Sequence, residues 1–177
     1  MPPLFGLTIL IVDGDPAALR ATRSVALKLG LAVECVQDGH RALAALGVHR
    51  VDAVVLDRNL PGLDGPDTAA AIRRIGTAWR GLPVIVLTTT PDADDAARCR
   101  RAGADAYLAK PLAPAMLAGA LLRLCREPAA DAPSVREWFD PTGPGAAARS
   151  RAAAQAALDV DAELETESVP AVSRSGR

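Results

Sequence analysis

Four polar residues with complementary chemistry stand at the ends of four apolar runs of the chain. Asp13, Asp57 and Thr88 each follow a strand-like run, and Lys110 follows a shorter one. In open α/β sheets, ligands bind at the carboxyl ends of parallel strands, so these residues would meet in one crevice. Two carboxylates, a hydroxyl and an ammonium group could there hold a cation beside a phosphate-sized anion. Each alone is an ordinary turn or capping residue, but all four in this order are hard to obtain by chance.

Five strands that alternate with five helices are the elements that would position these residues. Each strand-like run is followed by turn residues and then by a helical pattern. The predicted strands are Leu7–Val12, Leu31–Val36, Val51–Leu56, Pro83–Leu87 and Ala106–Leu108. The predicted helices cover about residues 16–29, 39–46, 65–75, 91–102 and 113–125. Five such units in a row predict an α/β fold whose parallel sheet is covered by helices on both faces.

The composition bounds the class of protein. Half of the 177 residues are hydrophobic and the formal net charge is −1, so the chain can bury a core and has no overall attraction to nucleic acid or acidic membranes. The apolar runs are too short to span a membrane, and the first residues do not have the pattern of a secretory leader. Three widely spaced cysteines suggest reduced thiols, so we expect a cytoplasmic protein.

The chain divides into two parts by composition. Residues 1–126 carry the strand and helix pattern, and residues 127–177 form a Pro- and Ala-rich extension that we expect to be partly disordered. A helix could form over about 146–164, although its apolar face is mostly alanine. Trp138 and Phe139 would anchor this extension, either on the first part or on a partner protein.

Four blocks of the chain resemble the receiver domain of response regulators, the phosphoacceptor modules of two-component signalling. The blocks are Ile9–Asp13, Val54–Gly65, Pro83–Thr88 and Gly103–Pro111. Their order and spacing both match, and the resemblance covers about residues 5–125. It implies a flavodoxin-like, doubly wound five-stranded parallel sheet in the order 2-1-3-4-5, with five helices and a C-terminal tail.

The resemblance also implies a phosphorylation site. Asp57 would be the nucleophile that accepts a phosphoryl group from the phosphohistidine of a histidine kinase or a histidine phosphotransfer protein. Mg²⁺ would neutralise the transferred group and would be held by the carboxylates of Asp13 and Asp57 and the backbone carbonyl of Asn59.

The remaining residues of the implied site would bind and report the phosphoryl group. Lys110 would bind one phosphoryl oxygen, and Thr88 would hydrogen-bond another. Tyr107 would repack as Thr88 moves, which would alter the face presented to a downstream protein target. The family commonly has a cis peptide bond before the residue that corresponds to Pro111.

Position 14 departs from the family pattern. Receivers normally have two adjacent acidic residues after the first strand, and here the pair is Asp13 and Gly14. Asp15 is acidic, but we expect it to cap the helix that begins at Pro16. The loss of one carboxylate should weaken Mg²⁺ binding. Either water fills the vacant position and the switch still works, or the domain is a pseudo-receiver that acts only as a binding surface.

These features favour a response regulator receiver that signals through protein contacts, with a phosphorylation-independent interaction module as the alternative. Residues after Arg126 show no helix-turn-helix pattern and no basic stripe, so we expect no DNA-binding domain. Apart from its own phosphorylation and dephosphorylation, we expect no enzymatic activity. The resemblance is also compatible with a homodimer.

Overall fold

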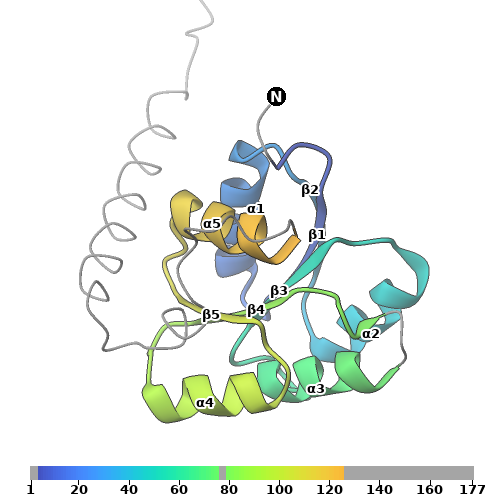
Figure 1. Ribbon diagram of the computed structural model, residues 1–177, viewed down its shortest axis with the longest axis vertical. Coiled ribbons are helices and arrows are strands. Elements are labelled where there is room, and N and C mark those ends of the chain that lie inside the picture. The colour runs from blue at the N-terminus through green and yellow to red at the C-terminus, as the bar shows by residue number, and fades with distance from the viewer. Residues whose placement is uncertain (1–3, 76–78, 126–177) are drawn as a thin grey trace, which may run out of the picture.

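The computed structural model describes residues 4–75 and 79–125, which form alternating strands and helices (Figure 1). The strands are β1 (Thr8–Val12), β2 (Ala32–Val36), β3 (Ala53–Asp57), β4 (Val84–Thr88) and β5 (Ala106–Ala109). The helices are α1 (Pro16–Lys28), α2 (Gly39–Val48), α3 (Gly65–Ile75), α4 (Ala93–Arg101) and α5 (Pro114–Cys125). The boundary after residue 126, the helix predicted at 146–164, and Trp138 and Phe139 lie outside the described residues.

The five strands form one parallel sheet in the order β2-β1-β3-β4-β5, which confirms the predicted topology. β3 pairs with β4 so that Asp57 lies opposite Leu87, and β4 pairs with β5 so that Thr88 lies opposite Ala109. The carboxyl ends of β1, β3, β4 and β5 therefore reach the same edge of the sheet. Asp57 and Thr88 are the last residues of β3 and β4, and Asp13 and Lys110 directly follow β1 and β5, so all four stand at this edge.

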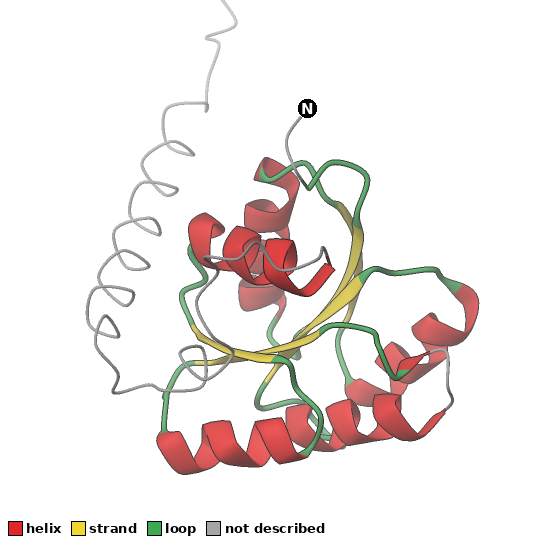
Figure 2. Cartoon of the chain, viewed as in Figure 1, coloured by secondary structure: helices red, strands yellow, loops and turns green. Residues whose placement is uncertain are grey.

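Two hydrophobic cores lie on opposite faces of the sheet. Alternate residues of each strand point to opposite faces, so Val54 and Leu56 of β3 pack on one side and Val55 packs on the other. Figure 2 shows α1 and α5 on one face and α2, α3 and α4 on the other. All three of these β3 residues are fully buried, as the near-continuous apolar runs of the sequence predicted.

Aspartates fix where three of the helices begin. The side chains of Asp15, Asp38 and Asp92 each accept a hydrogen bond from a backbone N–H of the first turn of α1, α2 and α4. Because Asp92 is the N-cap, α4 begins at Ala93 and not at the predicted Pro91. Gly30, with φ of 77°, follows the end of α1, where the left-handed backbone favours glycine. Among the described helices, none combines the length and the apolar character that a membrane crossing needs.

Candidate functional site

The carboxyl edge of the sheet holds a cavity lined by the predicted acidic residues and the predicted lysine. Asp57 is the last residue of β3, Asp13 follows β1, and Lys110 follows β5. All three line the cavity together with Asn59, which belongs to the loop between β3 and α3. The fold therefore brings together residues that are separated by 44 and 53 positions in the chain (from 13 to 57 and from 57 to 110).

Lys110 joins the two carboxylates. Its Nζ lies 2.5 Å from Oδ2 of Asp13 and 2.8 Å from Oδ1 of Asp57. The side chain of Asp13 is only 3% exposed, so water solvates its negative charge poorly. A single ammonium group thus compensates two carboxylates at the bottom of the cavity. The Lys110–Pro111 peptide bond is cis, as the resemblance implied.

The electrostatics of the site keep Lys110 charged. Burial by itself would lower the pKa of the Lys110 ammonium, but the hydrogen bonds and negative charges of Asp13 and Asp57 outweigh burial and raise the pKa above its ordinary value. Lys110 is therefore a fixed cation at neutral pH. A cation held at this point could bind an oxygen of a phosphoryl group attached to Asp57.

The two carboxylates keep acceptor capacity for a metal ion. Oδ1 of Asp13 accepts the N–H of Asp15 at 2.9 Å, and Oδ2 of Asp57 accepts the N–H of Asn59 at 3.1 Å. A carboxylate has about four acceptor positions, and each carboxylate here accepts one backbone N–H and the Lys110 ammonium. Across the described ranges, no group of three or more acidic, histidine or cysteine side chains gathers as a metal site. The donors fit Mg²⁺ only if it takes a backbone carbonyl and water as well.

The residue at position 14 explains how the site accommodates the missing carboxylate. A Cβ atom placed on Gly14 would lie 2.8 Å from Cδ of Pro61, so the Pro61 ring occupies the place where a side chain would begin. Asp15 does not replace that side chain, because its carboxylate accepts the N–H of Ala17 at 2.8 Å and caps α1. The capping role expected from the sequence is confirmed.

Thr88 and Tyr107 lie beside the cavity rather than in direct contact with the carboxylates. Thr88 is 1% exposed, and its hydroxyl accepts the N–H of Thr90 at 3.2 Å. It is Thr89, the next residue, that lines the cavity. The Tyr107 hydroxyl donates to Oδ2 of Asp95 at 2.8 Å. The structure thus brings Asp13, Asp57 and Lys110 into contact and leaves Thr88 and Tyr107 in an adjoining layer toward α4.

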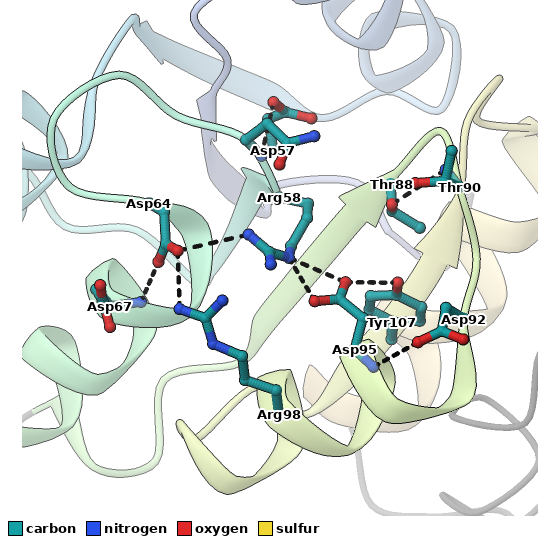
Figure 3. A network of polar contacts seen from close by, with 11 residues as sticks. Asp57, Arg58, Asp64, Asp67, Thr88, Thr90, Asp92, Asp95, Arg98 and Tyr107 are labelled. Carbon is teal, nitrogen blue, oxygen red and sulfur yellow. Dashed lines mark hydrogen bonds and ion pairs between the residues drawn. The ribbon is translucent and has the colours of Figure 1, made fainter.

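Sequence reasoning missed a second charged network next to Asp57. Arg58 directly follows Asp57 in the chain, and its side chain is only 16% exposed. Its guanidinium lies between Asp95 of α4 and Asp64 of the β3–α3 loop (Figure 3). The only sequence signal is strand alternation, which turns Arg58 away from the side that Asp57 faces and toward the helices of the opposite layer.

Comparison with known proteins identifies the family. The model of the response regulator receiver domain matches residues 9–122, and the chain belongs to this family of two-component signalling modules, whose general activity is to accept a phosphoryl group. The response regulator MprA of Mycolicibacterium vanbaalenii is 40% identical over 105 residues, which are 59% of this chain and 44% of MprA. The transcriptional regulatory protein KdpE of Mycobacterium tuberculosis is 37% identical over 103 residues, 58% of this chain and 44% of KdpE. The chain thus spans less than half the length of these two relatives.

Solved structures agree with this assignment. A response regulator from Chloroflexus aurantiacus superimposes with a TM-score of 0.64 at 30% identity, covering 67% of this chain and 97% of that chain. The receiver domain of the sensor histidine kinase PA1611 from Pseudomonas aeruginosa superimposes with a TM-score of 0.63 at 34% identity, covering 68% and 98%. The latter structure holds a magnesium ion coordinated in its active-site cleft.

Proposed function

We propose that this chain is a phosphoacceptor switch in which Asp57 receives a phosphoryl group from the phosphohistidine of a histidine kinase or a histidine phosphotransfer protein. The observation that carries the proposal is the contact of Lys110 Nζ with both Asp13 and Asp57, at 2.5 and 2.8 Å. An inert scaffold gains nothing from burying two carboxylates around one cation, because the desolvation of such groups is costly. A phosphoacceptor site uses such a cation to neutralise the charge of the transferred group.

The reaction needs few protein groups. An oxygen of the Asp57 carboxylate attacks phosphorus, a new P–O bond forms, and the P–N bond to the donor imidazole breaks. The imidazole keeps the bonding electron pair and takes up a proton from water. Phosphoryl transfer depends mostly on positioning and on neutralisation of charge. Lys110 supplies a positive charge beside Asp57 and remains next to the product acyl phosphate.

A magnesium ion fits the remaining part of the proposed site. Asp13 and Asp57 would supply carboxylate oxygens, and Asn59 would supply its backbone carbonyl from the cavity wall. When bound, Mg²⁺ would neutralise charge on the transferred group. We expect a modest affinity, because Gly14 offers no side-chain ligand and Pro61 crowds its position.

The output of the switch would pass through Thr88 and Tyr107. The Thr88 hydroxyl would turn to a phosphoryl oxygen and give up the N–H of Thr90 that it now accepts. Tyr107 would then change its packing against α4, and the surface of α4, β5 and α5 would contact a downstream protein or a second copy of the chain.

The thiols of Cys35 and Cys99 favour a reducing compartment, so we place the protein in the cytoplasm.

A phosphorylation-independent binding module is the second candidate function. The observation that favours it is the contact between Pro61 and the Cβ position of Gly14, because it leaves the metal side of the cavity short of one carboxylate. In this case Lys110 would keep both carboxylates permanently paired. The two candidates differ in whether Asp57 is modified at all.

Intact mass spectrometry of the full chain incubated with Mg²⁺ and acetyl phosphate distinguishes the two candidates. We expect one labile phosphoryl adduct on the wild-type protein and none on Asp57→Ala. Asp15→Asn is the matched control, because Asp15 lines the same cavity and asparagine also caps helices, so the adduct should persist. A wild-type protein that stays unmodified, beside a Gly14→Asp, Pro61→Ala variant that gains the adduct, would overturn the phosphoacceptor proposal and support the binding module.

A further inference from the structure

Arg58, the residue directly after the acceptor, is tied to helix α4. Its Nε lies 2.7 Å from Oδ1 and 2.9 Å from Oδ2 of Asp95, so the guanidinium engages both oxygens of one carboxylate. Figure 3 shows the Arg58 side chain extending toward α4, away from the Asp57 carboxylate. Burial opposes the charge of Arg58, but the hydrogen bond and charge of Asp95, together with Asp64, outweigh it and raise the pKa of Arg58.

Asp95 is shared between Arg58 and Tyr107. Its Oδ2 accepts the Tyr107 hydroxyl at 2.8 Å while the same carboxylate binds Arg58. Asp95 therefore connects the residue after the acceptor to the aromatic residue of β5 with only one side chain between them. This route does not pass through Thr88, which stands on the strand between β3 and β5.

The backbone of Arg58 holds the loop that carries the implied metal ligand. Its N–H donates to the carbonyl of Leu87 at 2.7 Å, and its carbonyl accepts the N–H of Gly65 at 3.1 Å. Arg58 thus closes the loop from Asn59 to Asp64 at its base. Within this loop, Oδ2 of Asp64 receives a second cation, Nη2 of Arg98 from α4, at 2.9 Å. Two ion pairs therefore join the loop to α4: Arg58 at the base of the loop binds Asp95 of α4, and Arg98 of α4 binds Asp64 of the loop.

We infer that Arg58 is a positioning residue that couples the acceptor loop to α4 and Tyr107 through Asp95. The Arg58–Asp95–Tyr107 chain of contacts, called here the α4 latch, holds the loop that carries the Asn59 carbonyl in its present place. An ordered loop presents its carbonyl to a metal ion without further entropic cost, so the latch should favour Mg²⁺ binding. The expected effect on Mg²⁺ binding rests on the proposed function, whereas the coupling of Arg58 to Tyr107 does not.

The inference predicts reciprocal coupling. If the latch favours Mg²⁺ binding, a change in Asp95 on α4 must alter the Mg²⁺ affinity at the cavity, although Asp95 does not line the cavity. The same reasoning predicts that a change in Arg58 alters the environment of Tyr107, which Arg58 reaches through Asp95. A merely local stabilising role for Arg58 would produce neither effect.

Fluorine NMR of fluorotyrosine-labelled protein tests the first half of the inference, because Tyr107 is the only tyrosine of the chain. In the metal-free 177-residue chain we expect the Tyr107 resonance to shift in Arg58→Met and in Asp95→Asn, and the double variant to match Asp95→Asn. Arg58→Lys keeps the positive charge and should return the resonance toward the wild-type position. Asp94→Asn, which changes an exposed carboxylate one residue away, is the matched control and should leave the resonance in place. A resonance that is identical in wild type and Arg58→Met would overturn the latch.

Amide NMR titration with Mg²⁺ alone tests the second half. We expect the half-saturating Mg²⁺ concentration, followed at the amides of Asp57 and Asn59, to rise about tenfold in Arg58→Met and in Asp95→Asn, with no further rise in the double variant. Asp94→Asn should titrate as the wild type does. Unchanged half-saturation in Asp95→Asn would overturn the coupling to the metal. A wild-type protein with no Mg²⁺-dependent shifts would overturn the metal site of the proposed function, while the fluorine resonance would still decide the latch.

Discussion

A Cβ atom on Gly14 would lie 2.8 Å from Cδ of Pro61 and 3.5 Å from the carbonyl oxygen of Gln37. The β3–α3 loop therefore closes over the position where receivers normally carry their second carboxylate. The pyrrolidine ring is rigid and cannot rotate away from an added side chain. Restoring the family pattern at position 14 thus requires two changes, one at each partner of this contact.

The first prediction concerns that pair. Gly14→Asp alone should lower the free energy of unfolding by about 1–2 kcal/mol, because the new Cβ overpacks against Pro61. Gly14→Asp with Pro61→Ala should recover this loss and lower the Mg²⁺ concentration at half-maximal phosphorylation about tenfold, roughly 1.4 kcal/mol of binding free energy. Urea unfolding and intact mass with acetyl phosphate measure the two effects, and Pro61→Ala alone is the control. Full stability of the single variant would contradict the steric argument.

The second prediction concerns Lys110. Lys110→Met leaves the 3%-exposed side chain of Asp13 beside Asp57 without a cation, so the protein should lose about 3 kcal/mol of unfolding free energy and nearly all adduct formation. Mg²⁺ should stabilise this variant more than the wild type, because the ion would replace the missing charge without displacing an ammonium group. Thermal unfolding with and without Mg²⁺ measures the difference. Arg20→Met, which changes an exposed residue of α1, is the control and should leave the free energy of unfolding unchanged. If Mg²⁺ stabilised Lys110→Met and the wild type equally, the result would count against Asp13 and Asp57 as Mg²⁺ ligands.

The geometry of the sheet edge that carries Asp13 and Asp57 could be predicted from the sequence because it depends on local rules. Buried strands read as continuous apolar runs, parallel strands end at one edge, and Asp15 before Pro16 is an ordinary start of a helix. These rules place Asp13 and Asp57 without knowledge of any loop. The resemblance then adds the proposed role of Asp57 as phosphoacceptor, which the rules alone do not supply.

The surroundings of that edge could not be predicted in the same way. The contact of Pro61 with Gly14 and the pairing of Arg58 with Asp95 both join segments 37 or more residues apart (47 for the first pair and 37 for the second). Each depends on how a loop packs after the sheet has formed, and neither leaves a periodic pattern. An arginine after Asp57 is as compatible with solvent as with a carboxylate until the position of α4 is known.

The third prediction concerns the ionisation of Tyr107. Burial, reinforced by the hydrogen bond to Asp95, raises the pKa of Tyr107 to about 12 from its ordinary value of 10.0. Because the folded protein keeps the Tyr107 proton to a higher pH than the unfolded chain does, the free energy of unfolding does not depend on this group below about pH 10. It falls by about 3 kcal/mol as the pH rises toward 12. Tyrosinate absorbance can follow it, since the chain has one tyrosine.

Two comparisons make the absorbance titration decisive. The urea-unfolded chain should show tyrosinate near the ordinary pKa of 10.0, and the folded chain should not. Asp95→Asn should lower the pKa of the folded protein by removing the negative charge while burial remains. Equal titration of folded and unfolded protein would show that the Tyr107 hydroxyl is not enclosed as the structure has it.

The fourth prediction separates the stability of the fold from the chemistry of the site. Arg73 of α3 donates to the backbone carbonyls of Trp79, Leu82 and Gly103 and pairs with Asp105 at 2.7 Å. Arg73→Met should lower the free energy of unfolding by about 2–4 kcal/mol, because these acceptors lose a charged donor in a partly buried setting.

The neighbouring arginine gives the matched control. Arg74 is exposed at the end of α3, so Arg74→Met should change the free energy of unfolding by less than about 0.5 kcal/mol in urea. In conditions where Arg73→Met is fully folded, its Mg²⁺ dependence of phosphorylation should equal that of the wild type, since Arg73 binds the amino-end side of β4 and β5 and the cavity lies at their carboxyl ends. Altered Mg²⁺ dependence in Arg73→Met would show that the loops at the two ends of the sheet are coupled, and that the α4 latch is not the specific connection argued above.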